Sequence, residues 1–125
     1  MTATYSTAMK NNRMQVVLDA INAGAGAGKL EIGTSGMVTV LATIALADPA
    51  GSVGGVGVLT LTVPQSDTSA DATGTAAAAR IRDSNDADVI TGLTVGLSGT
   101  EVILDSLSIT IGQKVTVTAA TFTHA

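Results

Sequence analysis

Few residues of this chain have the types and spacing that catalysis requires. Cysteine and tryptophan are absent, and the single histidine, His124, has no partner residue close to it in the sequence. Ser98 and Ser106 have no adjacent base, so no hydrolase arrangement is visible. Glycoside hydrolysis would need a carboxylate pair, such as Glu31 or Glu101 with an aspartate, and the sequence does not place one. We therefore predict that the protein is not an enzyme and has no catalytic residues.

A glycine-rich segment, Gly24 to Lys29, has some likeness to a phosphate-binding loop. In such a loop a strand leads into a helix, whose N-terminal N–H groups face the anion. Here the segment follows a predicted helix and precedes a predicted strand, and Leu30 stands where a serine or threonine would hold magnesium. We interpret the segment as a plain hinge and predict no bound nucleotide and no other cofactor.

Four oxygen-bearing residues, Asp83, Asn85, Asp86 and Asp88, lie at a predicted hairpin tip. Such loops can hold calcium. The EF-hand pattern, however, needs a glycine at its sixth position and a distal glutamate, and this turn has neither. Aspartate and asparagine are also preferred in turns, where they hydrogen-bond their own backbone. We therefore assign no metal site and leave open whether this turn binds an ion.

Two arginines of the same predicted hairpin, Arg80 and Arg82, share one face of a strand because side chains alternate across it. With the neighbouring aspartates they could form exposed cross-strand ion pairs, each contributing less than about 1 kcal/mol. They could equally form a contact between subunits, where arginine is favoured. Both interpretations stay open at this point.

The composition points to an assembly subunit. Only 13% of the residues are charged, against roughly 25% in an average domain. Large side chains supply most burial energy, about 1.5–3 kcal/mol for each fully buried valine or leucine, but Phe122 and Tyr5 are the only aromatic residues. Burial against copies of itself would add what such a thin core lacks.

Charge and hydropathy exclude several classes of partner. The net charge is -4 and the six basic residues are scattered, so nucleic-acid binding is not expected. The absence of cysteine excludes a disulfide framework and a thiolate zinc site. The first residues lack the pattern of a signal peptide, and the longest apolar stretch, around residues 38–47, is far shorter than the ~20 residues of a membrane helix. We expect synthesis in the cytoplasm, no membrane partner, and a soluble state until assembly.

The first part of the chain has a helical pattern. Ser6 or Thr7 can cap the helix at its start, and Gly24 suits a left-handed C-cap. We predict a helical arm over residues 1–23, a glycine hinge over 24–28 and a β-sandwich domain over 29–125. The positions at spacings of three and four that suggest the helical face are Met9, Arg13, Val16, Val17, Ala20 and Ile21.

After residue 28 the period changes to two, which indicates strands. Gly92 marks a candidate bulge. Residues 75–83 are ambiguous, since four alanines favour a helix but the alternation around Arg80 favours a strand, which we predict. The spacing of about 8–12 residues predicts a mainly β fold, an antiparallel β-sandwich with a jelly roll as one form, and one N-terminal helix. The expected strands cover residues 29–32, 37–46, 58–63, 75–83, 88–95, 101–105, 107–111 and 115–118, with 119–125 as an edge strand.

Six stretches of the sequence carry a resemblance to known proteins: Thr2 to Met14, Gly28 to Gly33, Ser66 to Asp83, Val89 to Gly96, Ile111 to Val117 and Thr123 to Ala125. They resemble a family of small structural proteins encoded in the virion gene clusters of tailed bacteriophages and prophages. The resemblance covers nearly the whole chain, carries no catalytic motif and implies a virion protein. Size, acidity and threonine-rich β content are similar to those of capsid decoration (cement) proteins, which bind the outer head shell as trimers or dimers.

The resemblance leads to a first hypothesis of a capsid decoration protein on the virion surface, made in the host cytoplasm. Its partners would be the major capsid protein and copies of itself, with the N-terminal segment docking on the shell or on a neighbouring copy. The candidate interface residues are Tyr5, Met9, Arg13, Val17, Arg80, Arg82 and Asp83. One alternative is a tail component, such as a tube, terminator or adaptor ring protein. Another is a carbohydrate-binding module on the virion, against which the scarcity of aromatic residues counts. Head or tail location, oligomeric order and symmetry axis stay open.

Overall fold

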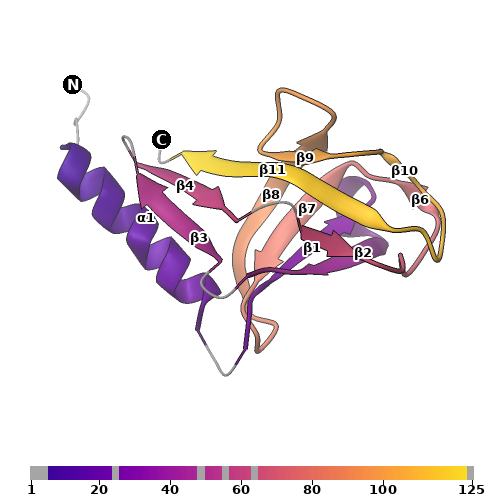
Figure 1. The fold of residues 1–125 in the computed structure, drawn as a ribbon, viewed down its shortest axis with the longest axis horizontal. Helices are drawn as coiled ribbons and strands as arrows, with labels where there is room; N and C mark the ends of the chain where they lie inside the picture. The colour runs from indigo at the N-terminus through magenta and orange to yellow at the C-terminus, as the bar shows by residue number, and fades with distance from the viewer. Residues whose placement is uncertain (1–5, 24–25, 48–49, 55–56, 63–64, 124–125) are drawn as a thin grey trace.

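The alternating pattern beyond residue 28 produces strands, and the chain is mainly β with one N-terminal helix, as predicted (Figure 1). The computed structural model describes residues 6–23, 26–47, 50–54, 57–62 and 65–123. The helix is α1 (Thr7–Ile21), and a short 3₁₀ helix, η1 (Ser35–Met37), precedes the second strand. The strands are β1 (Lys29–Gly33), β2 (Val40–Ala45), β3 (Gly51–Gly54), β4 (Val58–Leu61), β5 (Gln65–Asp67), β6 (Gly74–Thr75), β7 (Ala78–Arg82), β8 (Asp88–Gly96), β9 (Val102–Leu104), β10 (Ser108–Ile109) and β11 (Val115–Thr123).

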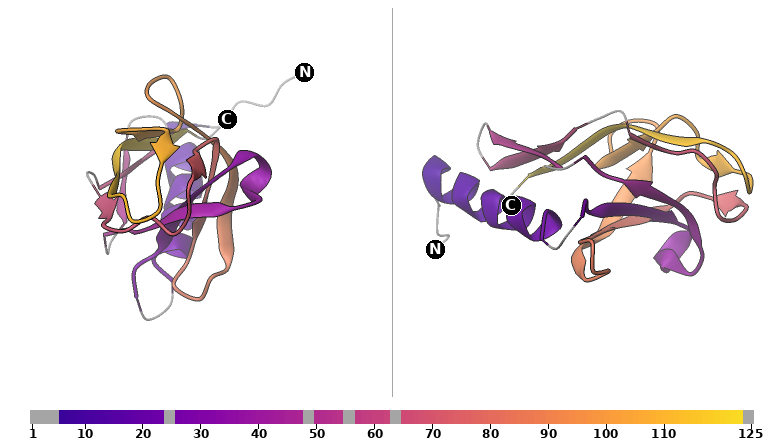
Figure 2. Two further views of the ribbon diagram at one scale, coloured as in Figure 1. Left: turned by 90° about the vertical axis from the view of Figure 1, so that its right-hand side faces the viewer. Right: turned by 60° about the horizontal axis from the view of Figure 1, so that its bottom comes forward.

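The main sheet is mixed and curled. Its order is β2-β1-β7-β8-β9-β11-β4-β3, and β5 pairs with β11 off this path. β8 and β9 run parallel, which departs from a wholly antiparallel sheet, because residues 97–101 fold back and bring Val102 level with Val95. The sheet curls until β5 lies beside β2, where the N–H of Thr43 donates to Asp67 Oδ2 at 3.0 Å. The result is a sandwich-like body with α1, β3 and β4 at one end and β6 and β10 at the other (Figure 2).

Alternation along the strands separates a buried face from an outer face. Leu30 and Ile32 of β1 and Ile81 of β7 have no exposed surface. In β7 the residues on either side of Ile81 are partly exposed on the outer face, whereas in β1 Glu31 is itself largely buried there. The core extends through β2, β4, β9 and β11 and is built mostly from alanine, valine, leucine and isoleucine, with Phe122 as its aromatic member. The thin aliphatic core expected from the composition is therefore present.

Helix α1 begins as predicted but buries a different face. Ser6 is its N-cap, and the Ser6 hydroxyl accepts a hydrogen bond from the N–H of Met9 at 3.2 Å. The helix ends at Ile21 with Asn22 as C-cap, and Gly24, the predicted cap, lies outside the described residues. The buried positions are Met14, Leu18 and Ile21. The predicted stripe was wrong for Met9 and Val16, which are exposed, because residues 14, 18 and 21 form a second stripe at the same spacings with larger side chains.

Two asparagines fix α1 along the hairpin of β3 and β4. Asn22 Oδ1 accepts from the N–H of Ala50, just before β3, at 3.0 Å. Asn11 Oδ1 accepts from the N–H of Gly57, just before β4, at 2.7 Å. The two bonds hold opposite ends of the helix to opposite ends of the hairpin.

Strand β11 is interior, so the expected edge strand at the end of the chain was wrong. Thr121 to Thr123 pair with β4, Ala119 and Ala120 pair with β9, and Val115 to Val117 pair with β5. A single long strand serves three neighbours because its register shifts between Val117 and Ala119. Residues 78–82 form a strand rather than a helix, as predicted. Strand β2 begins at Val40 instead of residue 37, since Ser35–Met37 form a 3₁₀ turn.

Candidate functional site

The outer face of β1, β7 and β8 carries the predicted site residues Arg80 and Arg82. Cross-strand register places Glu31 of β1 opposite Arg80, and Lys29 opposite Arg82. Asp88 of β8 lies opposite Arg82 on the other side. We call the group the charge ladder; its members are Lys29, Glu31, Arg80, Arg82, Asp86 and Asp88.

Within the charge ladder the arginines are paired inside the chain. Arg80 Nε donates to Glu31 Oε1 at 2.5 Å, and Glu31 is only 9% exposed. Arg82 Nε donates to Asp88 Oδ1 at 2.8 Å and lies 3.6 Å from Glu31 Oε1. The hydrogen bond to Asp88 is the main cause that raises the pKa of Arg82. Cross-strand ion pairs, one of the two interpretations, are therefore present, and the subunit contact stays a prediction.

In the acidic turn after β7, the carboxylates of Asp83 and Asp86 bind groups of the chain itself. Asp83 Oδ1 accepts from the N–H groups of Asn85 and Ala87 at 2.9 and 3.0 Å. Asp86 has a left-handed φ of 64° and binds Lys29 Nζ at 2.6 Å, which lowers the pKa of Asp86. Among the described residues, no three side chains of the metal-ligating types gather as a cluster.

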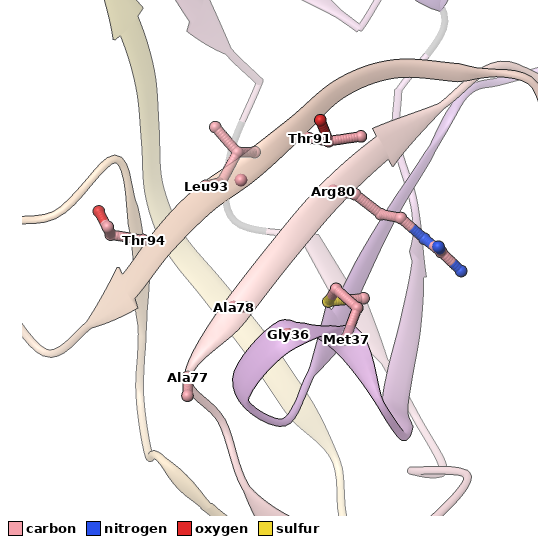
Figure 3. A pocket seen from close by; sticks show the side chains of 9 residues that line it. Gly36, Met37, Ala77, Ala78, Arg80, Thr91, Leu93 and Thr94 are labelled. Carbon is pink, nitrogen blue, oxygen red and sulfur yellow. The ribbon is translucent and has the colours of Figure 1, made fainter.

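Beside the charge ladder, the same face has a hollow of about 470 Å³. Figure 3 shows the Met37 side chain on one side of β7 and Leu93 and Thr91 on the other, with the guanidinium of Arg80 directed away from Ala78. Its lining is mostly apolar, and threonines and Arg80 supply the polar rim. The lining residues are Gly36, Met37, Ala77, Ala78, Arg80, Thr91, Gly92, Leu93 and Thr94.

A bulge in β8 opens the hollow. Ala79 pairs with Leu93 but Ile81 pairs with Ile90, so β8 has one extra residue opposite Arg80. Gly92 takes up this residue with a φ of 71°, a left-handed conformation that favours glycine, as the predicted bulge requires. A Cβ added at Gly92 would meet no atom within 4 Å. Of the two bulge residues, Thr91 lines the hollow, whereas Gly92 places no side chain in it.

The 34–39 loop forms the other wall. Gly36 and Met37 both have left-handed φ values, 71° and 57°, and such a conformation costs a residue like methionine about 1–3 kcal/mol. The loop is closed by hydrogen bonds from Met37 N to Thr34 O, Thr34 N to Thr39 O, and Thr39 N to Thr34 Oγ1. This arrangement directs Met37 against Gly33 and leaves Val38 85% exposed.

At the far rim of the hollow, Thr94 is tied to Glu101. Glu101 Oε2 accepts from both the N–H and the hydroxyl of Thr94, at 3.0 and 2.5 Å. These two bonds lower the pKa of the Glu101 carboxyl. They also connect β8 to the 97–101 loop, on which Leu97 is exposed.

The remaining predicted interface residues lie on or before α1. Tyr5 lies outside the described residues. Met9 and Arg13 are exposed on the helix, and Val17 is half-buried against the core. These helical residues and the residues of β7 belong to separate elements, so the predicted interface is divided between two surfaces.

Sequence reasoning missed the hollow and Val38 altogether. The available signal was the glycine beside Met37 and Val38 together with the bulge at Gly92, but nothing in the sequence places these two segments side by side. No family model, no curated protein and no solved structure matches this chain. Within the described ranges, no helix has the length and apolar character to cross a membrane.

Proposed function

We propose that this protein is a structural subunit of a bacteriophage virion, a decoration protein that binds the outer head shell as an oligomer. The observation that supports the proposal is a set of large apolar side chains exposed on a charge-poor surface. Val16 is 67% exposed, Ile111 65% and Leu97 60%, in addition to Val38. Covering such side chains with another protein lowers the free energy by about 25 cal/mol for each Å² of apolar surface removed from water.

The exposed face of α1 is the part proposed to meet the shell. Met9 and Val16 point outward, while Met14, Leu18 and Ile21 on the opposite face hold the helix in the core. The asparagine bonds to the β3–β4 hairpin keep the helix in place. Docking in this form would use a helix that is already ordered, so little conformational entropy is lost on binding.

This role is tested by changing the exposed face alone. Deleting residues 1–23 would remove three core side chains, so the better variant is the double substitution Met9→Lys and Val16→Lys. Binding to undecorated capsids, measured by co-sedimentation, should weaken at least about tenfold, since a charge would be buried at each position. The matched control Ile111→Lys, equally exposed but far along the chain, should bind as the wild type does. Undiminished binding of the double variant would remove α1 from the docking surface, and no binding by the wild type would overturn the decoration role.

A second candidate, a ring-forming tail component, is favoured by strand β3. Among the described strands β3 pairs only with β4, and its sequence, Gly51 to Gly54, has no charge to block pairing with another chain. Strands joined across subunits would close a ring. Native mass measurement of the purified oligomer separates the two roles: a sixfold ring supports the tail component, whereas a dimer or trimer supports decoration.

A further inference from the structure

A protruding apolar side chain of the 34–39 loop, Val38, lies close to the apolar recess on the outer face of β7 and β8. Val38 is the most exposed of the large apolar residues in the described part of the chain. Gly36, which lines the hollow, is close enough that a Cβ added to it would lie 4.0 Å from Val38 Cγ2. A projection and a recess of the same chemistry are therefore neighbours on one surface.

We infer that this surface binds a second copy of the chain, with Val38 of each copy entering the hollow of the other around a twofold axis. The inference rests on the proposed assembly role, for which it names a self-association surface distinct from the exposed face of α1. A twofold interface needs one patch that is complementary to itself. A projection next to a matching recess meets that condition.

The chemistry of the hollow favours an apolar protein side chain over a charged ligand. Arg80 is the one charged residue of the lining, and its Nε is already bonded to Glu31. The lining includes Ala77, Ala78 and Gly92, which offer space but little polarity. An apolar centre with threonines at the rim is the usual anatomy of a protein–protein interface.

The loop that carries Val38 is ordered before any partner binds. Its three backbone and side-chain hydrogen bonds hold Met37 in a left-handed conformation. Strain of this kind persists only where the surroundings enforce it and is frequent at functional sites. A preformed projection loses little entropy on association, which favours specific pairing over loose contact.

The first test is the mass of the isolated protein, measured by sedimentation equilibrium at concentrations up to about 1 mM, the range of weak specific association. The wild type should form dimers. Val38→Lys should weaken dimerisation at least about tenfold, because the ammonium group would enter an apolar recess. The controls Leu97→Lys and Ile111→Lys place the same charge on other exposed apolar sites and should leave dimerisation unchanged.

A second variant changes the hollow instead of the side chain that enters it. Ala78→Leu would add a larger apolar side chain to the lining of the hollow and leave the buried face of β7 unchanged, since Ala78 points outward. It should weaken dimerisation as Val38→Lys does, while circular dichroism shows that both variants fold. A monomeric or trimeric wild type, or variants that dimerise like the controls, would overturn the inference.

Cross-linking provides a readout that does not depend on affinity. Because the chain has no cysteine, Val38→Cys and Thr91→Cys can be made in separate chains, mixed and treated with a short bismaleimide. The mixed pair should cross-link several-fold more than a control pair of Leu97→Cys with Thr91→Cys, and equal yields would contradict the arrangement. No capsid is present in these experiments, so their failure leaves shell docking by α1 standing, and failed shell binding leaves the dimer standing.

Discussion

The two ends of the outer face of β1, β7 and β8 differ in the kind of surface that they present. At one end the charge ladder satisfies its charges within the chain, through Glu31, Arg80, Arg82 and Asp88. At the other end the bulge at Gly92 borders an apolar hollow. The arginines are the obvious candidates in a sequence with so few charges, yet it is at the apolar hollow that covering the surface lowers the free energy most.

The two ends differ in how much free energy would be released if a partner protein covered them. A charge that already has a hydrogen-bonded partner gains little from a second one and loses solvation when covered. Apolar surface gains in proportion to the area removed from water. The comparison therefore assigns a stabilising role to the charge ladder and an interaction role to the hollow, and the following predictions test that assignment.

The largest effect is expected at the buried carboxylate of the charge ladder. Glu31→Gln removes a charge that is 9% exposed and meets both arginines, and should lower the free energy of unfolding by about 1.5–3 kcal/mol. Asp88→Asn, at the exposed end, is the matched control and should cost less than about 1 kcal/mol. Urea denaturation measures both. Equal costs would show that burial does not distinguish the two carboxylates.

A smaller effect is expected where the bulge opens the hollow. Gly92→Ala fits the space but imposes a left-handed φ on alanine, at a cost of roughly 1–2 kcal/mol. Gly54→Ala is the control, since a Cβ there also meets nothing within 4 Å and its φ is not left-handed, and its effect should stay within about 0.5 kcal/mol. If thermal melting shows the same small change for both, the bulge does not depend on glycine.

Local features of this fold were predictable from the sequence because they depend on neighbouring residues. Examples are the N-cap Ser6, which was one of two candidates, the strand over residues 78–82 and the bulge at Gly92. Each follows from spacing, capping chemistry or a single conformational preference. The ion pairs of Arg80 and Arg82 were one of the two interpretations that the sequence allowed, since alternation places both side chains on one face.

Features that depend on which strands become neighbours were not predictable. The interior position of β11 follows from its pairing with β4, β5 and β9, and nothing within the strand itself records three partners. The hollow requires Met37 to lie beside β7 and β8, which are about forty or more residues further along the chain. The buried face of α1 was misassigned because two apolar stripes fit the helix, and contact with β3, β4 and β8 selects Leu18 over Val16.

The rim of the hollow should respond to pH through Glu101. Because its pKa is lowered by Thr94 in the folded protein, Glu101 stabilises the fold fully above the ordinary pKa of a glutamate, and this contribution is lost as the pH falls through the lowered value. The stability difference between wild type and Glu101→Gln should therefore be under about 1 kcal/mol at neutral pH and shrink on acidification. Denaturation midpoints at a series of pH values measure it, and a difference that grows towards acid would contradict the sign.

The salt dependence of dimerisation distinguishes the two ends most directly, although the expected effect is the smallest. Raising the ionic strength from about 0.1 M to 1 M shortens the screening length from ~10 to ~3 Å, which weakens contacts between exposed charges. A dimer formed through the hollow should keep its dissociation constant or bind slightly more tightly, and sulfate should strengthen it because such salts favour apolar burial. A dimer formed through the charge ladder would instead dissociate as salt rises, since Asp86 and Asp88 are the most exposed members of its ion pairs. The same sedimentation experiment, repeated across the salt series, decides which end of the face joins the copies.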